Sequence, residues 1–268
     1  MTSLAILGAG KMGEALLSGL LRSGTPVADV IVSTRRPERA KALEDKYGVS
    51  AVGSAVAAGR AQTLLLAVKP QDMGSLLTEI GPVVSADQLV VSMAAGIPTL
   101  TIERKLAGGV PVVRVMTNTP ALVDEAMSVL SAGAHADEAH LARAEDVFRH
   151  VGKVLRVPES QQDAVTALSG SGPAYFFFLV EAMIDAGILL GLPRAVAADL
   201  LVQTAVGAAV MLRDSGEHPV QLREAVTSPA GTTINAIREL EKHGVRAAFL
   251  AAIEAARDRS RELAAGQD

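Results

Sequence analysis

The sequence contains no cysteine and no tryptophan, and aromatic residues make up only 3% of its 268 residues. Without a thiol the chain has no disulfide framework, no zinc thiolate site and no cysteine nucleophile. A reducing compartment is compatible with this composition, and we expect a cytoplasmic protein. The N-terminus lacks a basic stretch ahead of its first apolar run, so we expect no secretory signal.

The sequence also lacks an excess of basic residues and a long apolar stretch without charged residues. The chain has 25 basic and 29 acidic residues, a net charge of −4. Because nucleic-acid binding needs a clustered basic surface, we expect no such partner. The longest apolar stretch, residues 174–190, contains Glu181 and Asp185, and carboxylates are costly in a bilayer. We therefore expect a buried helix of a soluble protein there, and no membrane contact.

The first residues carry the strongest motif. Residues 4–7 are typical of a buried strand, and residues 14–21 have helical apolar spacing. Between them stands a G-x-G-x-x-G turn. In such a turn Gly8 permits the tight bend, Gly10 lets the backbone approach a pyrophosphate and Gly13 lets helix and strand pack closely. The helix start offers N–H groups and a positive dipole end to phosphates. The pattern predicts a nucleotide site, with a plain structural turn as the alternative.

The next predicted strand, residues 30–32, ends at Ser33-Thr34-Arg35-Arg36. An NAD site would place an acidic residue about 20 positions beyond the last glycine. Ser33 occupies that position, and hydroxyl and guanidinium groups stand beside it, which suit a 2′-phosphate. We predict NADPH as the cofactor, with NADH as the alternative, and Thr34, Arg35 and Arg36 as contacts. The alternative for these residues is a solvated basic loop.

Further apolar runs predict strands at residues 63–68, 89–93, 112–116, 128–130 and 154–157, with a helix at 138–150 between the last two. Ligands in open α/β sheets bind beyond the carboxyl ends of strands. This places Lys69, the small residues 94–96 and Asn118 at the cofactor edge. A solvated lysine and an ordinary Asn-Thr-Pro turn are the alternatives.

The pattern changes after Pro158. Proline and glycine punctuation separates five predicted helices, at residues 173–190, 193–214, 220–226, 233–243 and 246–263. We therefore predict an α/β chain: a Rossmann-type dinucleotide-binding domain, residues 1–157, then an all-α domain, residues 158–268. Several helices are apolar on more than one face and need a cover. We expect a homodimer built mainly from residues after Pro158.

Two segments of the helical half look chemical. Residues 169–175 read as a flexible turn that enters a helix, and residues 227–233 likewise lead into one. Hydroxyls and free N–H groups at a helix start suit a small carboxylate. A simple helix cap is the alternative in both places.

Together these segments resemble the pyrroline-5-carboxylate reductase family. The matching pieces run along nearly the whole chain: residues 8–13, 67–71, 92–96, 118–120, 163–175 and 227–233. The resemblance implies a Rossmann domain followed by a helical dimerisation domain, with larger assemblies known. It also implies reduction of 1-pyrroline-5-carboxylate to L-proline by NAD(P)H, the last step of proline biosynthesis.

The resemblance also implies site residues. The substrate contacts would be Glu159, Ser228, Gly231, Thr232 and Thr233. To the cofactor contacts expected from the glycine turn (Gly8, Gly10, Lys11, Met12 and Gly13) and to Thr34, Arg35, Arg36, Lys69 and Asn118, the resemblance adds Ser54, Ala67, Val68, Pro70, Met93 and Ala95. The chain departs from the family at Thr117, Ser54 and Ala225, and at Ala230, where relatives have glycine; alanine conflicts there only if the backbone needs a positive φ.

An imine is already electrophilic, so positioning matters more here than a strong acid. We expect Thr233 to donate a hydrogen bond to the ring nitrogen and the Gly231 and Thr232 amides to hold the carboxylate; Tyr175 is a second candidate. One rival function is a 3-hydroxyacid dehydrogenase, which would want a lysine in the helical domain, and none lies between Lys153 and Lys242. The other rival is a non-catalytic NADPH-binding regulator.

Overall fold

The computed structural model describes residues 2–265 and contains two compact units. Unit 1 is formed by residues up to Ser171 and from Ala256 onward. Unit 2 is formed by Gly172–Ala255.

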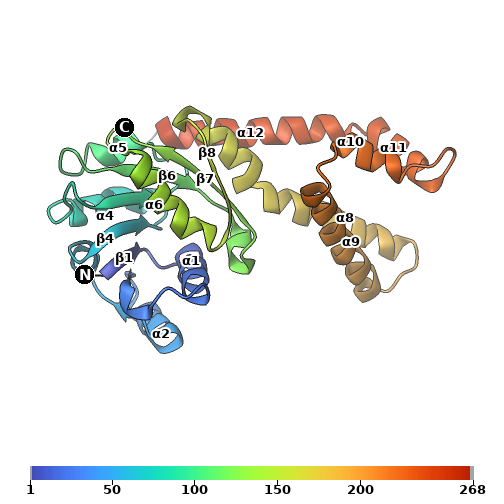
Figure 1. Cartoon of the computed structure of the whole chain (residues 1–268). Helices are drawn as coiled ribbons and strands as arrows, with labels where there is room; N and C mark the ends of the chain where they lie inside the picture. Colours follow the sequence, from blue (N-terminus) through green and yellow to red (C-terminus); the bar gives the residue numbers. More distant parts are fainter. Residues whose placement is uncertain (1, 266–268) are drawn as a thin grey trace. The chain divides into compact units, whose positions relative to one another are not determined.

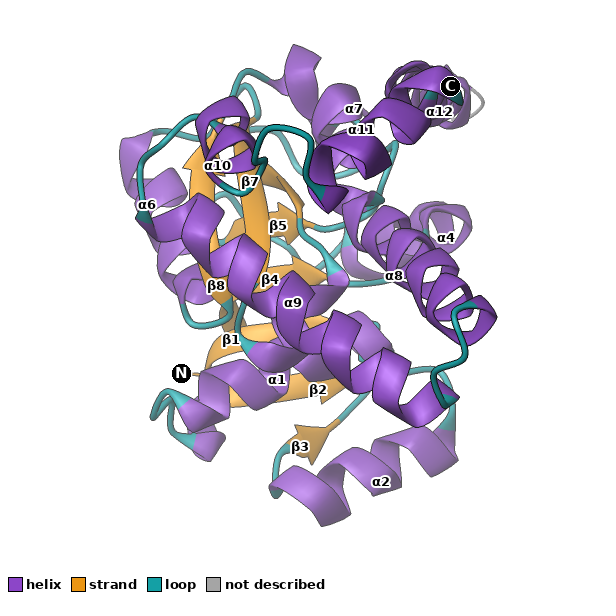
Figure 2. Cartoon of the chain, turned by 90° about the vertical axis from the view of Figure 1, so that its right-hand side faces the viewer, coloured by secondary structure: helices purple, strands orange, loops and turns teal. Residues whose placement is uncertain are grey.

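Unit 1 is built on an eight-stranded sheet (Figures 1 and 2). The strands are β1 (Thr2–Leu7), β2 (Val30–Ser33), β3 (Ser50–Ala51), β4 (Ala61–Leu66), β5 (Leu89–Ser92), β6 (Val112–Met116), β7 (Ala126–Ala132) and β8 (Gly152–Arg156). Their order is β3-β2-β1-β4-β5-β6-β7-β8, and every pair is parallel except β6 with β7. The chain order reverses beside β1, and this is where doubly wound sheets bind ligands.

Helices cover both faces of this sheet. Because side chains alternate along a strand, Leu4 and Ile6 enter one core while Ala5 and Leu7 enter the other. The first core is closed by α1 (Lys11–Arg22), α2 (Pro37–Tyr47) and α6 (Glu138–Arg149). The second is closed by α3 (Ser54–Ala58), α4 (Met73–Ile80) and α5 (Thr99–Glu103). Figure 2 shows β1, β2 and β3 beside α1 and α2.

Several details differ from the sequence-based expectation. The short elements β3 and α3 and the helices α4 and α5 were not predicted, and Ala67 and Val68 lie just past the end of β4. The strand expected at 128–130 is longer and runs antiparallel to β6. A short 3-10 helix, η3 (Thr119–Val123), joins the two strands, and a connection this short is compatible only with antiparallel pairing.

The segment after β8 is helical, so the expected flexible turn at 169–175 is wrong. It runs through η4 (Glu159–Gln161), α7 (Gln162–Val165) and a π-helical turn (Thr166–Gly170) into α8 (Gly172–Leu189). The buried Gln162 amide donates to Val129 O at 3.1 Å and to Ser131 Oγ at 2.8 Å. These bonds attach residues 159–171 to the sheet, so the compact units divide at Ser171 rather than at the expected Val157.

Unit 2 contains the five helices that the sequence predicts. They are α8, α9 (Arg194–Asp214), α10 (Pro219–Ala225), α11 (Thr232–Lys242) and α12 (Val245–Ala265), whose residues from Ala256 belong to unit 1. By length and composition alone, Glu159–Leu189 and Arg194–Asp214 are long and apolar enough to cross a membrane, a test that core helices of soluble proteins also pass.

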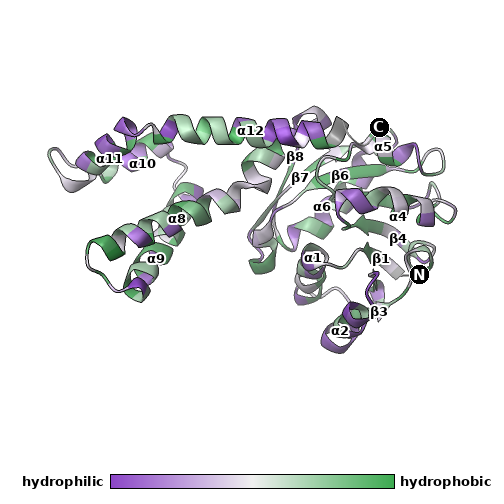
Figure 3. Ribbon diagram, turned by 180° about the vertical axis from the view of Figure 1, so that it is seen from behind, coloured by the Kyte–Doolittle hydropathy of each residue, from purple (hydrophilic) through white to green (hydrophobic). Residues whose placement is uncertain are grey.

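Many large apolar side chains of unit 2 are exposed in the single chain. Phe176, Phe177 and Phe178 of α8 are 66%, 69% and 73% exposed. Figure 3 shows the hydrophobic colour along α8 and α9. The expectation that residues 174–190 form a buried helix therefore does not hold for these three side chains in the single chain, because α9 packs on α8 but leaves them exposed.

Candidate cofactor and substrate sites

The glycine turn after β1 has the backbone that a tight bend requires. Gly8 has a φ of +91°, and a Cβ there would lie 2.9 Å from Val68 N. The Gly8 and Ala9 amides both donate to Ser33 O at 2.9 Å, which ties the turn to the end of β2. A side chain at position 8 would break this arrangement by its strained φ and by its contact with Val68.

The start of α1 fits a pyrophosphate. The first helical bond runs from Glu14 N to Gly10 O at 2.9 Å, so the N–H groups of residues 11–13 have no acceptor within the helix. No side chain caps this end. A Cβ at Gly10 would meet no atom closer than 3.9 Å, so the space over the turn is open. Free N–H groups and the helix dipole together favour an anion in that space.

Hydroxyl and guanidinium groups gather beyond the end of β2. The Ser33 and Ser54 hydroxyls are 3.1 Å apart, and Thr34 is half-buried beside them. Arg35 is exposed and pairs with Asp72, while Arg36 stands at the N-cap of α2. The predicted adenosine-side residues therefore lie together; their contacts with a cofactor stay predictions.

The sequence reasoning missed Arg39, whose side chain binds the backbone of the glycine turn. Its guanidinium donates to Ala9 O at 3.1 Å, to Gly10 O at 3.4 Å and to the Glu14 carboxylate. Lys46 and Tyr47 also donate to Glu14, both at 2.9 Å. These hydrogen bonds, that from Arg39 first, lower the pKa of Glu14 to about 2. No local spacing distinguishes Arg39 from Arg36, because the contact depends on where α2 packs.

The remaining predicted cofactor residues follow β4, β5 and β6 at one edge of the sheet. Lys69 and Pro70 follow β4, and Met93 and Ala95 follow β5, where Met93 N donates to Leu66 O at 3.0 Å. Asn118 follows β6 but is buried, donates to Ser169 O at 2.9 Å and accepts from Met127 N at 3.0 Å. Its amide therefore holds two segments together, and a cofactor contact of Asn118 stays a prediction.

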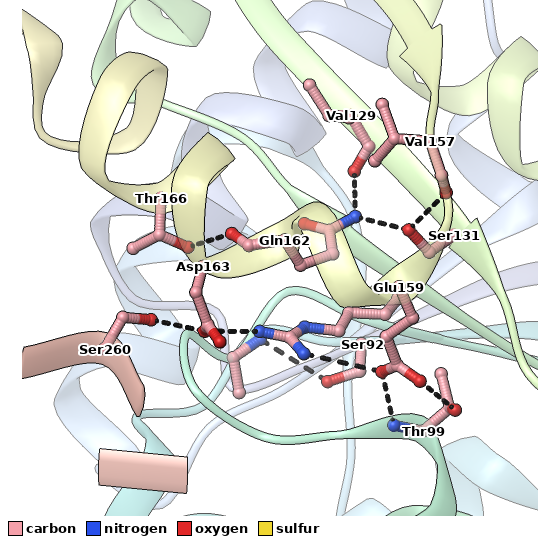
Figure 4. A network of polar contacts seen from close by, with 12 residues as sticks. Ser92, Thr99, Val129, Ser131, Val157, Glu159, Gln162, Asp163, Thr166 and Ser260 are labelled. Atoms are coloured by element: carbon pink, nitrogen blue, oxygen red, sulfur yellow. Dashed lines mark hydrogen bonds and ion pairs between the residues drawn. The ribbon is translucent and has the colours of Figure 1, made fainter. Parts of the chain in front are cut away.

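A buried arginine that the sequence reasoning missed, Arg114, lies close to the carboxylates of Glu159 and Asp163, which Figure 4 labels. Arg114 of β6, 6% exposed, is 3.4 Å from a Glu159 oxygen and 3.8 Å from an Asp163 oxygen. Glu159 also accepts from Thr99 N at 2.8 Å and Thr99 Oγ1 at 2.7 Å. Ser260 of α12 donates to Asp163 at 2.8 Å. These contacts give Glu159 a structural role, and its predicted substrate contact stays untested. The sequence did offer a signal for Arg114, because it is the one charged residue in an otherwise apolar strand.

In unit 2 the loop before α11 brings Ser228, Gly231, Thr232 and Thr233 into one turn. Gly231 is the N-cap of α11 and no side chain caps it, so the Thr232 and Thr233 amides have no acceptor within the helix. Gly231 N itself donates to Ser228 O at 3.1 Å. The loop itself thus engages the Gly231 amide, and the expected contact of this amide with a carboxylate stays a prediction.

The departure at Ala230 has a structural consequence. Its φ is +55°, the left-handed region in which L-residues are strained and glycine is not. A positive φ is the condition under which we expected alanine at position 230 to be unfavourable in place of the family's glycine. The chain thus keeps the turn that the loop needs and bears local strain beside Gly231.

Comparisons with known proteins agree with this layout. A family model described as "Pyrroline-5-carboxylate reductase dimerisation" matches residues 159–263, and one described as "NADP oxidoreductase coenzyme F420-dependent" matches residues 3–96. A curated pyrroline-5-carboxylate reductase of Corynebacterium melassecola is 46% identical, with 98% of this chain and 99% of the relative covered.

Solved structures are similar over the same span. One is a pyrroline-5-carboxylate reductase of Coxiella burnetii, with a TM-score of 0.91 and 36% identity over 98% of this chain and 99% of that one. Another is a pyrroline carboxylate reductase of Plasmodium falciparum with NADP bound, with a TM-score of 0.89 and 27% identity over 98% of both chains.

Proposed function

Because the chain belongs to the pyrroline-5-carboxylate reductase family, we propose that it reduces 1-pyrroline-5-carboxylate to L-proline with NADPH. One observation carries this proposal. The similarity covers 98% of the chain, so it includes both the glycine turn of unit 1 and the Ser228–Thr233 loop of unit 2. Proline biosynthesis is the process this reaction completes, and we propose the cytoplasm as its location.

Unit 1 would hold the cofactor. The open turn at Gly10 and the free N–H groups of α1 suit the pyrophosphate, and the hydroxyls and arginines after β2 suit a 2′-phosphate. The residues after β4 and β5, Lys69, Pro70, Met93 and Ala95, stand at the edge where the nicotinamide half would lie. When bound, the cofactor supplies a hydride. The acidic residue typical of NAD sites is missing beside Ser33, which favours NADPH, with NADH as the weaker alternative.

The Ser228–Thr233 loop would hold the substrate. The carboxylate would accept from the Thr232 amide, at the positive end of α11, and from the Ser228 hydroxyl. The Thr233 hydroxyl would donate to the ring nitrogen, whose protonated form is the better hydride acceptor. These groups orient a substrate that needs alignment more than acid catalysis.

The helical unit would form a homodimer, and such dimers could assemble into larger homo-oligomers. The family model for residues 159–263 is a dimerisation domain. Along α8 and α9 the chain leaves an apolar groove of about 370 Å³, lined chiefly by Phe176, Phe177, Val180, Ile184, Val202 and Val206. Burying these side chains against a second copy would remove them from water, the dominant favourable term in association.

Replacing Thr233 with alanine tests the substrate site. If its hydroxyl donates to the ring nitrogen, kcat/KM should fall by about 10²-fold or more. Thr233→Ser should restore most of the activity, because it keeps the hydroxyl, and NADPH affinity should not change. Thr204→Ala is the matched control, since its hydroxyl only returns to Leu200 O of its own helix. Unchanged kinetics in Thr233→Ala would discard the role.

One assay separates this function from its rivals. Oxidation of NADPH, followed by absorbance, should depend on the cyclic imine, and 3-hydroxyacids should not reduce NADP+ in the same preparation. A regulatory protein would bind NADPH and turn over neither. Rescue of a proline auxotroph by the gene gives the same answer in a cell.

A further inference from the structure

Two charged residues face each other across the end of β1. Arg35 lies beyond β2, and Asp72 ends a short 3-10 helix, η2 (Pro70–Asp72), beyond β4. Since β1 lies between β2 and β4, the pair spans the strand that leads into the glycine turn. Arg35 Nη2 and Asp72 Oδ2 are 2.8 Å apart. The Arg35 side chain is 78% exposed and that of Asp72 only 22%, so the carboxylate is the fixed partner.

Asp72 does not have the structural role that its position would give it. It stands at the N-cap of α4, where an aspartate usually accepts from the helix amides. No such cap bond forms here. Two hydrogen bonds hold its backbone instead. Asp72 N donates to Lys69 O at 2.9 Å, and the Ser75 hydroxyl donates to Asp72 O at 2.9 Å. The carboxylate is thereby free to face Arg35.

From this placement we propose that Asp72 competes with the cofactor 2′-phosphate for Arg35 and so limits the preference for NADPH over NADH. The inference rests on the proposed NADPH function. A guanidinium binds carboxylate and phosphate with the same donors, and Asp72 already engages Nη2 of Arg35, so a 2′-phosphate would compete with Asp72 for this side chain. A cofactor that lacks this phosphate leaves the ion pair in place. The cost of separating Arg35 from Asp72 therefore falls on the phosphorylated cofactor alone.

Binding of cofactor fragments tests this without catalysis. The probes are 2′,5′-ADP and 5′-AMP, which differ only in the 2′-phosphate, titrated calorimetrically into the whole protein. Asp72→Asn keeps the size and the N-cap chemistry but removes the charge. Because an exposed ion pair of this kind is worth up to about 1 kcal/mol, we expect Asp72→Asn to raise the affinity for 2′,5′-ADP about two- to fivefold. The affinity for 5′-AMP should stay unchanged.

The matched control is Asp124→Asn. Asp124 also lies in unit 1 and also pairs with an exposed arginine, Arg22, at 2.6 Å, but Arg22 ends α1 and Asp124 follows η3. Asp124→Asn removes the same charge as Asp72→Asn and should change the affinity for neither probe. In an Arg35→Met background, Asp72→Asn should lose its effect on 2′,5′-ADP, because the competition needs the guanidinium.

The other outcomes overturn the proposal. Unchanged or weakened 2′,5′-ADP binding in Asp72→Asn would mean that the carboxylate does not compete or that it orients Arg35. An equal change for both probes would assign Asp72 to the ribose or to the fold. An effect that survives in the Arg35→Met background would replace competition by simple charge repulsion. If the unaltered protein binds 2′,5′-ADP no better than 5′-AMP, the proposed NADPH preference itself fails, which is a separate result.

Discussion

The two units bury their apolar residues in opposite ways. Among the residues the structure describes, every buried hydrophobic residue except Ala197 belongs to unit 1. Unit 1 covers both faces of its sheet with its own helices. In unit 2 many large apolar side chains of α8 and α9 remain exposed in the single chain.

This difference shows what each unit needs in order to be stable. A sheet with helices on both faces completes its own core, because each layer covers the next. Helices that are apolar on several faces leave surface that only another protein surface can remove from water. We therefore expect unit 2 to depend on a second copy of the chain and unit 1 to depend on its internal contacts.

The largest expected effect is on assembly. Val202→Glu places a charge on the exposed apolar face of α9, where Val202 is 54% exposed in the single chain. Burying that charge without a partner should cost about 3 kcal/mol or more, so the dimer should dissociate at micromolar concentration. Sedimentation velocity measures this. Val83→Glu, at a 43% exposed valine of unit 1, should leave the mass unchanged. A Val202→Glu protein that stays dimeric would remove α9 from the interface.

The second prediction concerns the acid stability of unit 1. The folded pKa of Glu14, about 2 against an ordinary 4.5, is depressed first by the Arg39 hydrogen bond. A depressed carboxylate pKa adds stability above the ordinary pKa and loses it as the pH falls from about 5 to about 2. Glu14→Gln should therefore lower the free energy of unfolding of unit 1 by about 2–3 kcal/mol at pH 7.

Urea unfolding at pH 7, 5 and 3 gives the comparison for Glu14. The substitution should matter less at pH 3 than at pH 7, because the unaltered carboxylate has by then lost part of its advantage. Asp45→Asn, an exposed position of α2, is the control and should shift the curve by less than about 0.5 kcal/mol. Equal losses at all three pH values would contradict the assigned pKa.

A smaller effect is expected where α12 joins unit 1. Ser260 is buried and donates to Asp163, so Ser260→Ala should cost about 1–2 kcal/mol by leaving part of that carboxylate unsatisfied. Faster amide hydrogen exchange in the last turns of α12 would locate the loss. Ser3→Ala removes an exposed hydroxyl bond to Asp29 O and should change little. Unaltered exchange in Ser260→Ala would show that α12 is held by packing instead.

The smallest expected effect is at Ala230. Ala230→Gly relieves a φ of +55° and should raise the free energy of unfolding by about 0.5 kcal/mol, the strain relieved being partly offset by the greater entropy of glycine in the unfolded chain. Ala42→Gly, in the exposed interior of α2, should lower it by about 1 kcal/mol. The two substitutions are chemically the same, so opposite signs would isolate the backbone conformation. Chemical denaturation of both variants measures it.

Local patterns predicted the elements well and their connections less well. The glycine turn, the strands β1, β2, β4, β5 and β6, and the five helices of unit 2 follow from apolar period and from Gly and Pro punctuation. The direction of β7 and the helical run through residues 159–171 did not, because strand direction and a π-helical turn depend on what the segment packs against.

The candidate site divides in the same way. Gly8 and the Ser228–Thr233 loop were predicted because their chemistry lies in consecutive residues. Arg39, Arg114 and Asp72 were missed because each acts on a partner at least 25 positions away, as in the Arg39–Glu14 bond, and no spacing rule reports such a contact. Asn118 was predicted at the correct edge, but its buried amide was already engaged.

The sequence alone determined that a nucleotide turn precedes an apolar helical half, because both are periodic or contiguous features of the chain. Only the tertiary structure decided where charges meet: Arg39 behind the glycine turn, Arg114 between Glu159 and Asp163, and Asp72 opposite Arg35. The physical reason is that burial and ion pairing depend on distances through space, which strand order and helix packing set after local structure has formed.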